Sequence, residues 1–137
     1  MSKDQYDRGM KTRRKVLGDE WVDRAERNKN AFNADFQDLI TRYAWDEIWN
    51  RPGIAHPVRR MIVIAQMVAL GRWEEFQLHV RAALQSGELD QEDIKEVLLQ
   101  SAVYCGVPAA NTAFKEAREV IAKLAPATPA KRGKPRK

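Results

Sequence analysis

The segment PVRRMIVIAQMVALG at residues 57–71 decides the fold. After Arg59 and Arg60 its residues are almost all apolar, and Gln66 is the one strongly polar side chain among them. A proline at the start and a glycine at the end are typical of the two ends of an α-helix. A helix that is apolar on nearly every side belongs in an interior. We therefore expect this segment to be the central, buried helix of a helical protein.

Helical periodicity continues on both sides of this segment, without the alternation typical of strands. Glycine and proline fall at the joints, for example at Arg51-Pro52-Gly53 and Ser86-Gly87. Further helices are expected at residues 3–17, 33–49 (N-cap Asn33), 73–85, 90–105 (N-cap Asp90) and 108–124. The pattern predicts an all-α fold, a compact bundle of about six helices formed by residues 1–125.

The positive charge lies at the C-terminal end of the chain. The chain has 24 basic and 19 acidic residues and a net charge of +5. Five of the 24 basic residues fall in residues 126–137, which contain no acid, so the remainder is balanced at 19 against 19. A basic face that binds nucleic acid should belong to the folded domain. We expect a disordered basic tail at residues 126–137 and no nucleic-acid partner, although binding through the tail is an alternative.

The sequence also predicts a cytoplasmic protein without metal or cofactor. No apolar run reaches the roughly 18 residues of a membrane span, and no hydrophobic segment follows the N-terminal charges. Cys105 is the single cysteine, so an intrachain disulfide is excluded. Phosphate-binding and dinucleotide-binding glycine motifs are absent. His56 and His79 are too far apart in sequence to form a helical metal pair.

His79 is the first candidate for chemistry. On the helix at residues 73–85 it shares one face with Phe76 and Ala83, so its imidazole should point to the interior or a cleft. There its pKa could be tuned near neutrality. A core histidine bonded to a carbonyl group would give the same pattern.

Two further candidates lie on the following helix. Leu99 and Val103 share the side of Glu96, so we expect this carboxylate to be partly covered and its pKa raised. A surface glutamate paired with a basic residue is the alternative. Cys105 closes the helix, where a single cysteine could equally be an inert small hydrophobic residue.

Basic and aromatic residues surround the Pro52-Gly53 turn. Arg51 and Arg59, next to Arg60, could bind carboxylates with their guanidinium groups, or could be solvated charges at helix ends. Trp45 and Trp49 are one helical turn apart. Such a pair is more often part of a core or a subunit interface than of a ligand site.

From Tyr6 to about Ile121 the chain resembles the carboxymuconolactone decarboxylase family. The matching stretches are GMKTRRKVLGDEWVDRA, FQDLITRYAWDEIWNRPG, QLHVRAALQSG and EDIKEVLLQSAVYCGVPAANTAF. The resemblance implies an alkylhydroperoxidase-D-like fold and a homo-oligomer, a hexamer or trimer, with its site near a subunit interface. It also implies cofactor-free decarboxylation of 4-carboxymuconolactone, a lactone dicarboxylate, to the β-ketoadipate enol-lactone.

This chemistry suggests roles for the candidates. His79 would donate the proton or stabilise the dienolate, and Glu96 would orient His79 or relay the proton. Cys105 completes the catalytic set. The expected substrate-binding residues are Arg51, Arg59, Tyr104 and Trp45.

A thiol-dependent peroxidase is the alternative within the same fold. The peroxidases of the alkylhydroperoxidase-D-like fold use a pair of cysteines, because a second, resolving thiol must form a disulfide with the first. Cys105 is followed by Gly106-Val107-Pro108 without a second thiol, which argues against that activity.

Overall fold

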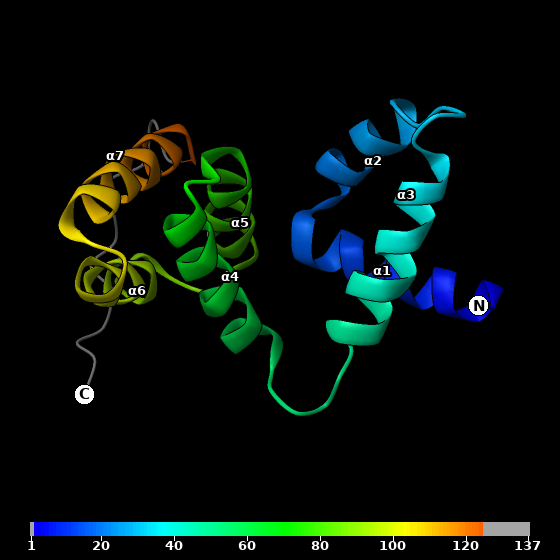
Figure 1. Ribbon diagram of the computed structural model, residues 1–137, viewed down its shortest axis with the longest axis horizontal. Helices are drawn as coiled ribbons and strands as arrows, with labels where there is room; N and C mark the ends of the chain where they lie inside the picture. The colour runs from blue at the N-terminus through cyan, green and yellow to red at the C-terminus, as the bar shows by residue number, and fades with distance from the viewer. Residues whose placement is uncertain (1, 125–137) are drawn as a thin grey trace.

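The computed structural model describes residues 2–124, so the predicted tail at 126–137 lies outside the described residues. These residues form helices and no strand, which confirms the all-α prediction. The elements are α1 (Lys3–Leu17), α2 (Asp19–Arg27), α3 (Ala34–Ile40), the π-helix η1 (Thr41–Ile48), α4 (His56–Leu70), α5 (Trp73–Ser86), α6 (Gln91–Tyr104) and α7 (Val107–Leu124). Figure 1 shows them in two groups, α1 to η1 and α4 to α7, joined by the loop before α4. No helix in the described part is long and apolar enough to cross a membrane.

The helix α2 was not predicted. It turns away from α1 at Gly18, whose φ of 90° lies in a region that side chains disfavour. Of its nine residues only Val22 is buried, and no side chain caps its first turn. A helix of nine residues with a single buried side chain offers too few apolar positions to be recognised in the sequence.

The predicted helix at residues 33–49 is composite, because α3 continues directly into the π-helix η1. The N–H of Trp49 donates to the carbonyl of Ala44, five residues back, at 2.9 Å. The wider turn places Thr41, Trp45 and Asp46, all buried, toward α1. Here α1 carries Gly9, and a Cβ atom at this position would overlap the carbonyl oxygen of Thr41. The close crossing of α1 and η1 therefore requires glycine.

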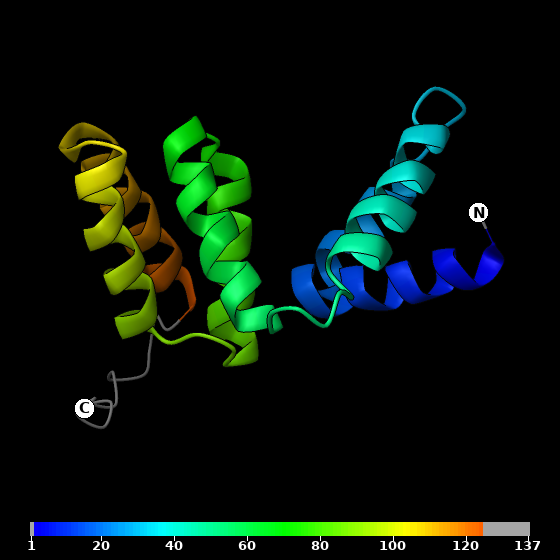
Figure 2. The same cartoon turned by 60° about the horizontal axis from the view of Figure 1, so that its bottom comes forward.

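The helix α4 is less buried than predicted. Arg60, Ile64 and Val68 are buried along one side, while Ile62 is 43% exposed and Leu70 is 69% exposed. Figure 2 shows the reason, since α4 lies at the side of its group and not at its centre. The expectation of burial on nearly every side is wrong for the single chain.

The helix α5 joins the two groups. Its Phe76 and Val80 belong to the core shared by α4, α6 and α7, whereas Leu78 belongs to the core of the N-terminal group. His79 therefore lies at the boundary between the two hydrophobic cores. The helix α6 has the predicted N-cap Asp90, whose side chain accepts from the N–H of Asp93 at 2.9 Å.

Candidate functional site

A buried arginine contacts His79 at this boundary. Arg60 is fully buried on α4. Its Nη1 donates to Nδ1 of His79 at 2.9 Å, its Nε donates to Glu88 at 2.8 Å, and its Nη2 donates to the carbonyl of Val16 at 2.6 Å. The guanidinium thus links α1, α5 and the loop before α6 while its charge is compensated by Glu88.

This contact determines which nitrogen of His79 carries the proton. A guanidinium can only donate, so Nδ1 is the acceptor and the proton sits on Nε2. Burial lowers the pKa of His79 to about 3, and the charge of Arg60 acts in the same direction, against a smaller opposing effect of Glu75. The ring is therefore neutral at pH 7. The predicted inward orientation of His79 is confirmed. The hydrogen-bond partner of its ring is an arginine and not a carbonyl group.

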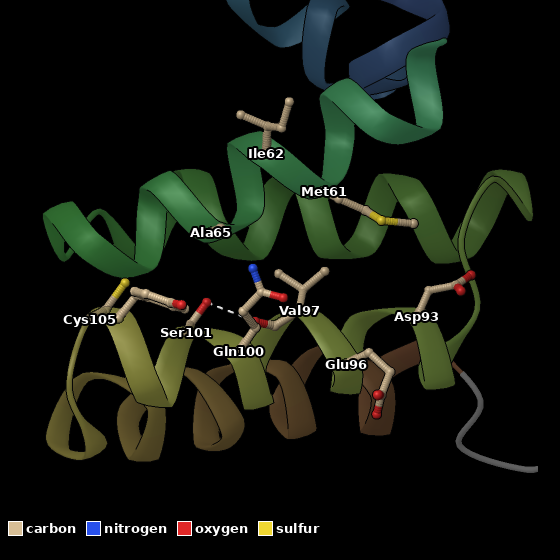
Figure 3. Close-up of a pocket in the computed structure, with 10 residues that line it drawn as sticks. Met61, Ile62, Ala65, Asp93, Glu96, Val97, Gln100, Ser101 and Cys105 are labelled. Carbon is tan, nitrogen blue, oxygen red and sulfur yellow. Dashed lines mark hydrogen bonds between the residues drawn. The ribbon is translucent and has the colours of Figure 1, made fainter. Parts of the chain in front are cut away.

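A groove lies between α4 and α6 (Figure 3). Its volume is about 440 Å³. It is lined by Met61, Ile62, Ala65, Asp93, Glu96, Val97, Gln100, Ser101, Tyr104 and Cys105. These residues include two acids and no basic side chain. In the single chain this α4–α6 groove would repel a dianionic ligand.

Three of the predicted site residues, Glu96, Tyr104 and Cys105, line the groove without forming a catalytic cluster. Glu96 is exposed, because Leu99 and Val103 are themselves 49% and 75% exposed and do not cover it. The prediction of a covered carboxylate is therefore wrong for the single chain. Figure 3 shows Cys105 at one end of the groove and Glu96 well along it. Cys105 follows Glu96 by nine positions, which is about 13 Å along a helix.

Glu96 also makes no hydrogen bond to His79 within residues 2–124, so the expected Glu96–His79 pair is absent there. The polar partner of the imidazole is Arg60. The signal for this role was present in the sequence, since Arg60 precedes Ile64 and Val68 at four-residue spacing on the inward face of α4.

The remaining candidates lie elsewhere. Arg51 and Arg59 are neighbours as expected, because Nη2 of Arg59 donates to the carbonyl of Arg51 at 3.2 Å, yet neither lines the α4–α6 groove. Trp45 is a core residue whose ring lies 5.4 Å from that of Trp49. The N-terminal core covers it in the single chain, and its role in substrate binding stays a prediction.

The fold and these contacts define a class of protein: an all-α chain with a buried neutral imidazole. No group of three potential metal ligands occurs in residues 2–124. The sequence model of the carboxymuconolactone decarboxylase family matches residues 34–119, and the chain belongs to this family. The resemblance noted in the sequence is thereby confirmed.

Individual relatives support the same assignment. The chain is 41% identical over 120 residues to a 4-carboxymuconolactone decarboxylase of Acinetobacter baylyi, covering 88% of this chain and 89% of the relative. It is 37% identical over 116 residues to a nitrosuccinic acid decarboxylase of Metarhizium robertsii, covering 85% and 80%. A 4-carboxymuconolactone decarboxylase of Pseudomonas putida is 55% identical over 42 residues, covering 31% of this chain and 88% of the relative.

Proposed function

We propose that this chain decarboxylates 4-carboxymuconolactone to the β-ketoadipate enol-lactone, without a cofactor, as a cytoplasmic homo-oligomer. The observation that carries the proposal is the 41% identity to the Acinetobacter baylyi enzyme of that name over nearly the full length of both chains. The two relatives that align over most of this chain are named as decarboxylases of different acids, so the reaction common to their names is loss of CO2.

The substrate itself can supply the electron sink. The carboxylate to be lost stands on a saturated ring carbon next to the ring double bond, and that double bond is conjugated to the lactone carbonyl. As the bond to the carboxylate breaks, its electron pair moves through the double bond onto the carbonyl oxygen and gives a dienolate. One proton then adds to the carbon next to the carbonyl. The protein must hold the anion and stabilise the dienolate oxygen.

The state of His79 favours dienolate stabilisation over proton delivery. Its ring is neutral, it accepts from Arg60 at Nδ1 and it carries a donor at Nε2. A fixed neutral donor can hydrogen-bond an oxygen on which negative charge develops. A residue with a pKa of about 3 is seldom a cationic acid at pH 7.

The α4–α6 groove requires a second copy of the chain in this proposal. Val103, Tyr104 and Val107 are 75%, 83% and 69% exposed on the helices beside it. A soluble single chain rarely exposes so many neighbouring apolar side chains. A trimer or hexamer that covers them would bring Glu96, Tyr104 and Cys105 next to a neighbouring copy, and Arg51 and Arg59 remain candidates for carboxylate binding. Sedimentation of the purified protein tests this point, and a monomer at micromolar concentration would contradict it.

The relative from Metarhizium robertsii suggests a second substrate. Nitrosuccinic acid is also a dicarboxylic acid, and its nitro group can accept the electron pair that the lactone carbonyl accepts in 4-carboxymuconolactone. The same site could therefore serve either acid.

One assay separates the two substrates. The purified protein is incubated with EDTA and freshly generated 4-carboxymuconolactone, and in parallel with nitrosuccinate, while ultraviolet absorbance and CO2 are followed. We expect stoichiometric CO2 from the lactone with little from nitrosuccinate. Release of CO2 from nitrosuccinate alone would identify nitrosuccinate as the substrate in place of the lactone. Absence of CO2 release from both acids would contradict the proposal.

A further inference from the structure

A second cavity lies between α1 and the start of α4. This α1 cavity is an open depression of about 290 Å³, lined by Arg8, Lys11, Thr12, Lys15, Asn50 and His56, of which only Thr12 is buried. The four residues from α1 are spaced by three, four and seven positions, so they lie on one face of that helix. Three of the six lining residues are cationic and none is acidic. This charge pattern is the opposite of that of the α4–α6 groove.

The charge of Arg8 is already compensated. Its Nε and Nη2 donate to the two carboxylate oxygens of Asp46 at 3.1 and 3.2 Å. This bidentate pair, together with a hydrogen bond from Asn50, lowers the pKa of Asp46 against the effect of burial. Arg8 therefore contributes to the wall of the cavity more than to its net charge.

Lys11 and Lys15 have no such partner. Neither forms an ion pair with any residue between Ser2 and Leu124. The one polar contact of Lys15 in this region is a hydrogen bond from Nζ to Nδ1 of His56, at 3.3 Å. Two ammonium groups thus line a cavity that contains no counter-ion among its side chains.

The walls of the cavity are held in place by hydrogen bonds. Thr12 donates to Oδ1 of Asn50 at 2.7 Å, and Nδ2 of Asn50 donates to Asp46 at 3.0 Å. Because Nδ1 of His56 accepts from Lys15, its Nε2 carries the proton and donates to the carbonyl of Trp49 at 2.8 Å. A site whose walls are ordered before binding loses less entropy when a ligand enters.

We propose that the α1 cavity binds a small dicarboxylate anion, with Lys11 and Lys15 as the carboxylate-binding residues. The identity of this anion as the substrate or product of decarboxylation rests on the proposed function. The binding of a dicarboxylate as such rests only on the charge and size of the cavity. Trp49 connects this cavity to His79. Its ring contacts that of His56 edge-on, with centroids 5.6 Å apart, and lies parallel to the ring of His79 at 6.4 Å.

The test uses succinate, an unreactive dicarboxylate, and acetate as the singly charged comparison. Binding to the full chain is measured by calorimetry for the unmodified protein, for the double variant Lys11→Gln/Lys15→Gln, and for Lys115→Gln/Lys123→Gln. The second variant removes the same charge from two lysines on α7 that are exposed, as Lys11 and Lys15 are, but lie outside the cavity. We expect the unmodified protein to bind succinate more tightly than acetate. The affinity for succinate should fall about tenfold or more in the first variant and stay unchanged in the second.

Equal binding of succinate to all three proteins, or no binding at millimolar concentration, would overturn the inference. Mapping of backbone amide shifts in the unmodified protein provides an independent measurement if the first variant is unstable. Shifts at Lys11, Lys15 and His56 support the site, and shifts confined to the α4–α6 groove refute it. Because succinate is not turned over, failure of the decarboxylation assay leaves this result unaffected.

Discussion

The indole of Trp49 lies nearly parallel to the imidazole of His79, with an angle of 7° between the planes and 6.4 Å between the ring centroids. Arg60 donates to Nδ1 of the same imidazole. One face and one nitrogen of the ring are thus held by neighbours, which fixes its plane. Within the described residues Nε2 makes no hydrogen bond, so it is the nitrogen left for a ligand.

Substitution of His79 tests whether this nitrogen acts as a donor. We expect His79→Ala to lower kcat for the lactone by about 100-fold, the size of effect seen when one oxyanion donor is removed. His79→Gln keeps an amide N–H near the position of Nε2 and should lose clearly less. Steady-state kinetics with circular dichroism as a check of the fold measures both. Equal and large losses in the two variants would indicate a proton-transfer role instead.

The low pKa of His79 predicts how stability depends on pH. The folded pKa is about 3 and the ordinary value is 6.5, so the unfolded chain binds more protons between these values. The free energy of unfolding should therefore fall as the pH falls below 6.5, by about 1.4 kcal/mol per pH unit from this group. Urea denaturation at pH 6.5 and 4.5 measures it.

The variant His79→Gln is the control for this measurement, because it cannot take up the proton. Over the same two pH units it should lose about 2–3 kcal/mol less than the unmodified protein. Both pH values stay above 3.8, the ordinary pKa of an aspartate. Below that value the lowered pKa of Asp46 would add its own loss of stability as the pH falls. Parallel curves for the two proteins would show that His79 is not buried in its neutral form.

Replacement of Arg60 tests the buried network. Arg60→Met leaves the carboxylate of Glu88 and the carbonyl of Val16 without their partner, and breaking a buried ion pair from one side costs about 3–5 kcal/mol. Arg59→Met on the same helix removes a half-buried guanidinium that bonds one carbonyl, and should cost about 1 kcal/mol. Denaturant unfolding compares them, and equal losses would contradict the special position of Arg60.

The sequence predicted those features that depend on local pattern. The ends of α1, the N-cap Asp90 of α6 and the inward face of His79 follow from spacing and from the residues at helix ends. The helix α2 was missed because it buries only Val22. The π-helical turn in η1 lies at the crossing with α1 at Gly9, a contact between segments distant in sequence that no local pattern shows.

The candidate site could be predicted only in part for the same reason. Spacing placed His79 inward but could not show that Arg60 is its partner, since the two residues come from different helices. Exposure of Glu96 depends on what covers α6, which periodicity within one helix does not reveal. The α1 cavity combines one face of α1 with Asn50 and His56, which are distant in sequence, so no local sequence pattern predicts it.

Gly9 tests the crossing that positions the α1 cavity. Gly9→Ala places a methyl group against the Thr41 carbonyl, so α1 must shift away from η1. We expect a loss of about 1–3 kcal/mol, as for overpacking elsewhere, together with weaker succinate binding. Gly53→Ala is the matched control, because a Cβ atom there meets nothing within 4 Å. Thermal denaturation and calorimetry measure both effects, and unchanged stability would mean that the helices are further apart.

Cys105 decides between the decarboxylase and the peroxidase. The thiol is half-buried at one end of the α4–α6 groove, and no second cysteine exists in the chain to form a disulfide with it. Cys105→Ser nearly keeps the size of the group, replaces the thiol by a more polar hydroxyl and removes thiol chemistry. We expect the lactone decarboxylase activity to stay within about threefold of the unmodified protein, a change below 1 kcal/mol in the activation barrier. A loss of 100-fold or more, combined with peroxide consumption by the unmodified protein, would instead assign the chain a thiol-dependent reaction and remove His79 from the centre of the mechanism.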